Sequence, residues 1–132
     1  MSDLLNGPED ECFRAEIRDF VVKKLHPETR DKVAQGAPLV HEDFTRWHSS
    51  LYEKGWVAPA WPVEFGGPGW SARQRLIADE EMFRLHTPPI PGFGIKMIGP
   101  ILMRFGSEAQ RARFLPRILS GDDWWCQGFS EP

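Results

Sequence analysis

The sequence is poor in cysteine and in net positive charge, and each shortage excludes a class of protein. Its 132 residues include two cysteines, Cys12 and Cys126, which lie far apart in different contexts. We therefore expect two free thiols rather than a disulfide, which excludes a disulfide-stabilised scaffold. The formal net charge is −3, and no stretch of the chain forms a basic face. The composition therefore argues against a protein that binds nucleic acid.

Long hydrophobic runs are also missing. The longest apolar stretch, residues 95–102, is interrupted by Lys96, Gly99 and Pro100. It is far shorter than the roughly 20 residues that a membrane span needs. The first residues, MSDLLNGPEDE, do not combine a positive segment with an apolar core, so no signal peptide is predicted. The sequence therefore predicts a cytoplasmic protein without a membrane span.

What the chain does have is a helical pattern of apolar residues. Hydrophobic residues make up 41% and charged residues 27%, as in soluble globular domains long enough to bury a core. Apolar side chains recur at helical spacing between Pro- and Gly-rich turns, which predicts an all-α, up-down domain of about five helices. Ser-x-x-Gln capping boxes at Ser71 and Ser107 mark two of the helix starts. The expected helices span residues 8–25, 41–54, 71–85, 93–105 and 107–121.

Two segments depart from an ordinary helix-and-loop pattern. Residues 55–70, GWVAPAWPVEFGGPGW, combine three tryptophans with prolines and glycines, and an aromatic loop of this kind is expected to fold back onto a core or a ligand. The helix expected at 93–105 is apolar almost all round, which predicts burial on most of its faces, including Ile98 and Leu102. Pro100 predicts a kink there, or a junction between two shorter helices.

The end of the chain changes period. Residues 124–129, WWCQGF, alternate in character, which predicts a strand with Cys126 as a buried thiol. A single strand finds no partner in an all-helical chain, and unpaired backbone groups are a liability. We therefore expect residues 1–123 to form a helical domain and residues 124–132 to begin a β domain that is absent from this chain.

Two groups of polar residues have simple structural explanations. Glu80 and Glu81 are adjacent, so they point to different sides of a helix, and a solvated face or a structural salt bridge is favoured over a paired-carboxylate site. His41 and His48 lack further ligands that would complete a metal set. The sequence therefore predicts no catalytic residue and no metal site.

Three motifs together resemble a known family. They are PVEFGGPG at 62–69, FGSEAQRARFLPRILSG at 105–121 and FSEP at 129–132. With the spacing between them, they make nearly the whole chain similar to the N-terminal helical domain of acyl-CoA dehydrogenases. The ending WWCQGFSEP is most similar to a bacterial subset that includes pimeloyl-CoA dehydrogenase large subunits and actinobacterial enzymes of steroid or aromatic degradation.

The resemblance implies part of an FAD-dependent oxidoreductase of lipid metabolism, as in fatty acid β-oxidation. In that family an N-terminal helical domain precedes a middle β domain and a C-terminal helical bundle. FAD takes a hydride from the acyl β-carbon while a carboxylate, usually Glu, removes the α-proton. The family's partners are an acyl-CoA substrate, the electron-transfer flavoprotein and a second acyl-CoA dehydrogenase subunit, identical or related. The catalytic carboxylate belongs to the parts that this chain lacks, so the chain alone is expected to be inactive.

The resemblance also assigns roles to residues. Gln127, Phe129 and Ser130 match positions near the flavin ring, with the Ser130 hydroxyl and backbone N–H at its pyrimidine edge. The alternative left open is that Phe129 belongs to a sheet core and that Ser130 is a turn residue.

A second set matches the wall of the acyl pocket. Phe93 and Met97 are expected to contact apolar substrate, and Gly94 to leave room for it. The alternative is that Phe93 and Met97 are ordinary helix core. A non-catalytic helical module for subunit contact, derived from the same domain, remains the alternative function.

Overall fold

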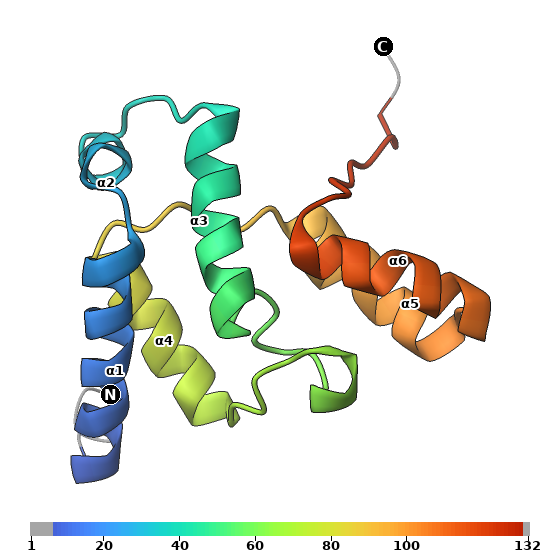
Figure 1. Ribbon diagram of the computed structural model, residues 1–132, viewed down its shortest axis with the longest axis horizontal. Coiled ribbons are helices and arrows are strands. Elements are labelled where there is room, and N and C mark those ends of the chain that lie inside the picture. The colour runs from blue at the N-terminus through green and yellow to red at the C-terminus, as the bar shows by residue number, and fades with distance from the viewer. Residues whose placement is uncertain (1–6, 131–132) are drawn as a thin grey trace.

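The computed structural model describes residues 7–130, which form six α-helices and no β-strand (Figure 1). The all-α prediction is therefore confirmed. The α-helices are α1 (Pro8–Lys24), α2 (Pro27–Ala34), α3 (His41–Lys54), α4 (Ala72–Arg84), α5 (Gly99–Phe105) and α6 (Glu108–Ser120). A short 3₁₀ turn, η2 (Val63–Phe65), and a π-helical segment, η3 (Phe93–Ile98), complete the element order.

Helix ends follow the capping signals of the sequence. Ser71 Oγ accepts a hydrogen bond from the backbone N–H of Gln74 at 3.2 Å, while Gln74 Oε1 accepts one from the Ser71 N–H at 2.9 Å. Ser107 and Gln110 repeat this pair at the start of α6. Gly55 ends α3 in the left-handed conformation, with φ 78°, which glycine adopts without steric cost.

The helices form two groups that α3 joins. α1 packs against α4, α5 packs against α6, and α3 reaches α6 between them (Figure 1). The core runs through both groups, with Ile17, Leu51 and Leu115 among its buried members.

The aromatic loop 55–70 folds back onto this core, as predicted. Trp56 and Trp61 are buried, and Trp56 packs against Phe20 with ring centroids 4.7 Å apart. Such aromatic contacts add to the area that the rings bury, so this loop acts as core rather than as a surface connection.

The short helix α2 was not predicted from the sequence. The sequence predicts that Pro27 ends the first helix. In the structure, Pro27 is instead the first residue of α2, where the missing backbone N–H of proline costs nothing. α2 has no strong apolar stripe, and a polar contact holds it. Thr29 Oγ1 donates a hydrogen bond of 2.6 Å to Asp43 Oδ1, and Lys32 Nζ lies 3.0 Å from Asp43 Oδ2. Asp43 therefore connects α2 to α3.

The predicted helix 93–105 is two elements, and the prediction that most of its faces are buried is wrong. η3 ends at Ile98 and α5 begins at Gly99, so the junction expected at Pro100 is present. Leu102 is buried as predicted and Ile98 is half-buried. Four apolar residues spaced four apart are instead exposed, and we call them the apolar stripe: Phe93, Met97, Ile101 and Phe105.

The predicted strand 124–129 is not formed. Residues 124–130 are irregular, and Cys126 is exposed rather than a buried strand thiol. An extended segment needs a hydrogen-bonded partner before it forms a strand, and no strand is present among residues 7–130 to pair with it. The last two residues of the predicted β-domain start, 131–132, lie outside the described part of the chain.

Candidate functional site

The candidate site is built on the unusual backbone of η3. In this π-helical segment the Gly99 N–H donates to the Gly94 carbonyl, five residues back. The Ile95 carbonyl loses the partner that an α-helix would give it, and Pro100 has no N–H to replace it. Trp61 Nε1 donates to that carbonyl at 2.8 Å in the buried interior. The aromatic loop therefore completes the hydrogen bonding of η3, and π-helical turns of this kind often occur at functional sites.

Gly99 makes this contact possible. A Cβ at this position would lie 2.3 Å from Trp61 Cζ2, closer than atoms can approach. The absence of a side chain at Gly99 therefore allows the Trp61 indole to reach the Ile95 carbonyl. The Gly-Pro pair at 99–100 is the sequence signal for this arrangement, but nothing in the sequence identifies Trp61 as the donor.

The predicted acyl-pocket residues separate into two kinds of position. Phe93 and Met97 have exposed fractions of 39% and 50%, so their side chains are open to a partner or ligand. Gly94 is buried, and a Cβ there would lie 3.0 Å from Ile118 Cγ2 and 3.4 Å from Trp125 Cδ1. Within the chain, Gly94 therefore leaves room for Ile118 and Trp125.

The C-terminal tail, residues 121–130, is anchored at its root. Trp125 packs edge-on against Phe114 with centroids 5.6 Å apart. Trp124 lies against His41 at 4.9 Å and donates from Nε1 to the Gly121 carbonyl at 2.9 Å. The two tryptophans thus fix residues 121–125 onto α3, η3 and α6.

The predicted flavin-edge residues follow directly after this root. Gln127, Phe129 and Ser130 are all exposed, and Phe129 has 84% of its surface open to solvent. Figure 1 shows the tail leaving the end of α6 and pointing away from the helices. The contact between Gly94 and Trp125 brings the two predicted sets of residues to one corner of the molecule, although their side chains do not form a closed pocket among the described residues.

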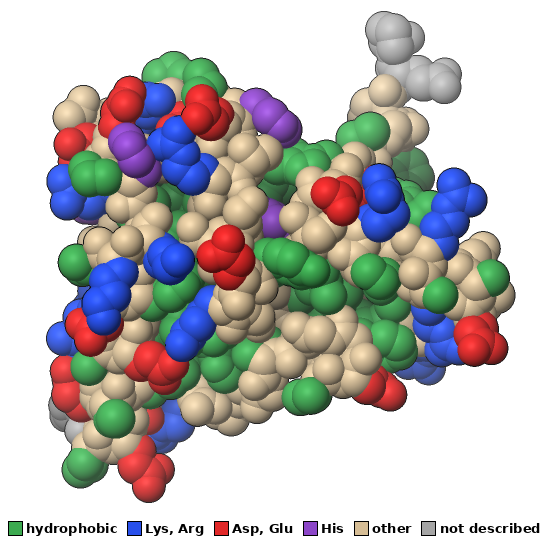
Figure 2. Space-filling model, in the orientation of Figure 1, with side chains coloured by type: hydrophobic (Ala, Val, Ile, Leu, Met, Phe, Trp, Pro, Cys, Tyr) green, Lys and Arg blue, Asp and Glu red, His purple; other side chains and the backbone are tan. Residues whose placement is uncertain are grey.

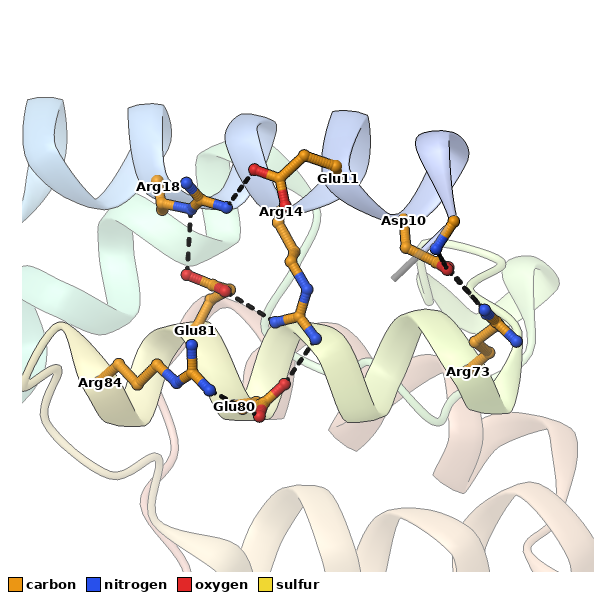
Figure 3. A network of polar contacts seen from close by, with 9 residues as sticks. Asp10, Glu11, Arg14, Arg18, Arg73, Glu80, Glu81 and Arg84 are labelled. Carbon is orange, nitrogen blue, oxygen red and sulfur yellow. Dashed lines mark hydrogen bonds and ion pairs between the residues drawn. The ribbon is translucent and has the colours of Figure 1, made fainter. Parts of the chain in front are cut away.

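The acidic pair Glu80–Glu81 forms structural salt bridges, as predicted (Figure 3). Arg14 of α1 reaches both carboxylates on α4 at 2.7 Å, and both the Arg14 and Glu81 side chains are buried. The Arg14 guanidinium holds the pKa of Glu80 below its usual range. These carboxylates join two helices and are not free to act as a catalytic pair.

A second ion pair lies at the start of the same helices. Arg73 donates two hydrogen bonds to Asp10, from Nε at 2.7 Å and from Nη2 at 2.5 Å. The Gly7 N–H donates to the same carboxylate at 2.9 Å. The Arg73 hydrogen bonds, with the Gly7 N–H, lower the pKa of Asp10 to about 2.

His41 and His48 do not form a metal site, and residues 7–130 contain no cluster of three or more His, Cys, Asp or Glu side chains that could hold an ion. His41 lies against Trp124. His48 is buried, and its Nε2 lies 2.8 Å from the Leu119 carbonyl. No helix among the described residues is long and apolar enough to cross a membrane.

This arrangement defines an all-helical domain that presents an apolar stripe along η3 and α5 and an exposed tail after α6. A family model described as "Acyl-CoA dehydrogenase, N-terminal domain" matches residues 7–122. The chain therefore belongs to the acyl-CoA dehydrogenase family, and the resemblance seen in the sequence motifs is confirmed.

Several similar proteins come from mycobacteria. Acyl-CoA dehydrogenase IpdE1 of Mycolicibacterium smegmatis is 38% identical over 125 residues, which cover 91% of this chain and 32% of that protein. Acyl-CoA dehydrogenase FadE26 of Mycobacterium tuberculosis is 34% identical, with 95% and 32% covered. The chain thus spans about a third of the length of these relatives.

Two solved structures have a similar fold. The ChsE4–ChsE5 complex from Mycobacterium tuberculosis matches with a TM-score of 0.76 and 31% identity, covering 96% of this chain and 31% of the matched chain. The Tcur3481–Tcur3483 steroid ACAD matches with a TM-score of 0.71 and 33% identity, covering 89% and 30%.

Proposed function

We propose that this chain is the N-terminal helical domain of an FAD-dependent acyl-CoA dehydrogenase, which forms a double bond between the α- and β-carbons of an acyl-CoA thioester. The family supplies the reaction class. The observation that carries the chain's own role is that Gly94, which lies between the exposed Phe93 and Met97 in the chain, packs beside Trp125 at the root of the tail.

The exposed tail residues suit a flavin in their chemistry. A flavin ring has apolar faces and a polar edge that needs hydrogen bonds. Phe129 offers an aromatic face, and Gln127 and Ser130 offer an amide and a hydroxyl, all three exposed. When bound, FAD supplies the hydride acceptor of the reaction. The role proposed for these three residues is to hold and orient its ring.

The apolar stripe suits the acyl group. Phe93 and Met97 would form one wall of the acyl slot, with Gly94 keeping that wall close to Trp125. Since one similar structure is described as a steroid ACAD and another as a complex of two proteins, we further propose a ring-bearing acyl group and a second dehydrogenase subunit. The electron-transfer flavoprotein would receive the electrons.

The test is substrate-dependent dye reduction by the purified, FAD-loaded enzyme that contains this domain, with straight-chain and steroid-derived acyl-CoA thioesters. Met97→Ala is expected to raise KM about tenfold, the usual effect of removing a small apolar contact from a pocket. Phe83→Ala is the matched control, because Phe83 is equally apolar and 84% exposed on α4.

One result would reject the proposed reaction, and a second would reject the role given to Met97. One is the absence of acyl-CoA oxidation by the flavin-loaded wild type, which together with binding to a dehydrogenase subunit would favour a non-catalytic module. The other is an equal KM for Met97→Ala and the wild type, which would remove Met97 from the pocket wall.

The 132-residue chain alone is expected to bind FAD weakly or not at all. Only three exposed tail residues are assigned to the ring, and ordering that tail would cost conformational entropy. Titration of the chain with FAD, followed by flavin fluorescence, is expected to show no saturable binding at micromolar concentration. A yellow purified chain that releases flavin stoichiometrically on denaturation would contradict this expectation.

A further inference from the structure

An open groove lies between the end of α3, the short turn η2 and one face of α6. Its volume is about 570 Å³, within the range of roughly 300–1,000 Å³ that small-molecule sites occupy. The aromatic loop and α6 meet beside it, since a Cβ at Gly66 would lie 2.5 Å from Leu119 Cδ1. The groove shares no residue with the apolar stripe or the tail.

The lining of the groove is mainly apolar. Phe65 of η2 and three residues of α6, Leu115, Pro116 and Leu119, supply most of it. Leu115 is buried in the core, and Phe65 and Leu119 pack against that core, so this surface is held in place by the fold. In small-molecule sites an apolar lining contacts the body of a ligand, and the few polar groups decide which ligand fits.

Most polar groups of this lining are hydrogen-bond acceptors. The Glu64 and Glu108 side chains line the groove, and neither forms an ion pair with another residue of the described range 7–130. Pro116 stands inside α6 and has no N–H, so the Ala112 carbonyl lacks its usual helical partner. Carboxylates and carbonyls only accept hydrogen bonds, so they favour a ligand that donates them.

The charges of the lining favour a cation. Arg111 also lines the groove, but its Nη1 is directed to the Met103 carbonyl of α5, at 3.4 Å. Two carboxylates therefore share the lining with one guanidinium that already has an acceptor. A hydrogen bond from a charged donor to a carboxylate is stronger than one between neutral groups.

Two aromatic rings, those of Tyr52 and Phe65, complete the lining. The face of an aromatic ring attracts a cation, and ammonium groups are commonly recognised in this way. We infer that the groove binds an organic ammonium ion with an apolar body, such as an arylalkylamine. Glu64 and Glu108 hold the ammonium group, and the apolar body lies on Phe65 and Leu119. This site is independent of the proposed function.

The first test is an NMR titration of the chain, whose 15.2 kDa suits the method, at low ionic strength. The probes are phenethylammonium, phenethyl alcohol and phenylpropionate. Phenethylammonium is expected to shift the signals of Tyr52, Ala112 and Leu119 and to bind about fivefold more tightly than the neutral alcohol. Tyr52 is the only tyrosine of the sequence, so its ring signals are identified directly. Phenylpropionate is expected to bind most weakly.

Equal affinities for the amine and the alcohol would overturn the inference, because the charge of the ligand would then play no part. Shifts that lie outside the groove would overturn it as well, since they would indicate non-specific attraction to the acidic surface.

The second test uses variants of the groove. Ala112→Leu fills it with a larger side chain and is expected to weaken phenethylammonium binding at least fivefold; Ala112 is exposed, so the fold should persist. Glu64→Gln combined with Glu108→Gln is expected to abolish the preference for the amine over the alcohol. Glu28→Gln is the matched control, because this exposed carboxylate lies on α2, outside the groove.

Phenethylammonium binding that is unchanged by Ala112→Leu would overturn the inference by placing the ligand elsewhere. A preference for the amine that persists in the Glu64→Gln, Glu108→Gln double variant, or that falls equally in Glu28→Gln, would overturn the role given to the two carboxylates.

Discussion

The α1–α4 side of the molecule and the η3–α5 side differ in the residues that they bury and expose. Between α1 and α4 the buried charges are paired, as Arg14 with Glu81 and Asp10 with Arg73. Along η3 and α5 the large apolar residues Phe93, Met97 and Phe105 are open to solvent. Figure 2 shows charged side chains gathered over the first group of helices and again over the α6 end, with a broader hydrophobic area between them.

The difference separates an interface inside the domain from a surface that is open to other molecules. A charge network that satisfies its own members needs no further protein. An exposed apolar stripe on a helix is typical of a surface that meets a partner or a ligand. The charged interface between α1 and α4 is therefore an internal support of the domain, and the η3–α5 side is the face that the proposed function requires.

The largest expected effect is on the support side. Arg14→Met removes the partner of the buried Glu81 carboxylate and is expected to lower the free energy of unfolding by about 3–5 kcal/mol, nearer 3 because Arg18 still contacts Glu81. Urea unfolding measures the loss. Arg30→Met, at an exposed ion pair, is the control and is expected to change stability very little. Equal losses for both variants would contradict the structural role given to Arg14.

Adjacent residues of α5 sharpen the comparison. Leu102 is buried and Ile101 is exposed, so Leu102→Ala is expected to cost about 2–5 kcal/mol. Ile101→Ala removes a similar apolar side chain from the stripe and is expected to cost less than about 0.5 kcal/mol. Thermal melts of the two variants measure both. An unchanged melting temperature for Leu102→Ala would contradict the burial of this side chain in α5.

The sequence predicted the parts of this fold that depend on local chemistry. The capping boxes at Ser71 and Ser107, the inward fold of the aromatic loop and the junction before Pro100 follow from residue type and spacing. Helix α2 was missed because its stability comes from Asp43, which lies outside it. The exposure of Phe93 and Met97 could not be predicted, since periodicity identifies an apolar face but not what covers it.

A smaller effect is expected at the hydrogen bond between the aromatic loop and η3. Trp61→Phe keeps the ring but removes the donor to the buried Ile95 carbonyl, and leaving that acceptor unpaired is expected to cost about 1–3 kcal/mol. Trp124→Phe is the matched control, because its N–H bonds the Gly121 carbonyl at the surface. Hydrogen exchange in η3 should increase in Trp61→Phe alone. A stability equal to the wild type would show that the π-helical turn does not depend on Trp61.

The smallest expected effect is the acid sensitivity of the support side. The pKa of Asp10 is about 2 in the folded chain because Arg73 and the Gly7 N–H bond its carboxylate, against about 3.9 when unfolded. A lowered folded pKa contributes stability that is present above the unfolded pKa and is lost as the pH falls from about 4 toward 2. Asp10→Asn should therefore reduce the loss of melting temperature over that pH range. It should not abolish the loss, because the pKa values of Glu80 and Asp43 are also lowered. Asp19→Asn removes the same charge from an exposed position of α1 and controls for net charge. If melting temperature falls with pH as steeply in Asp10→Asn as in the wild type, the Asp10–Arg73 pair adds no acid-sensitive stability. The contrast with the η3–α5 side would then depend on Arg14 alone.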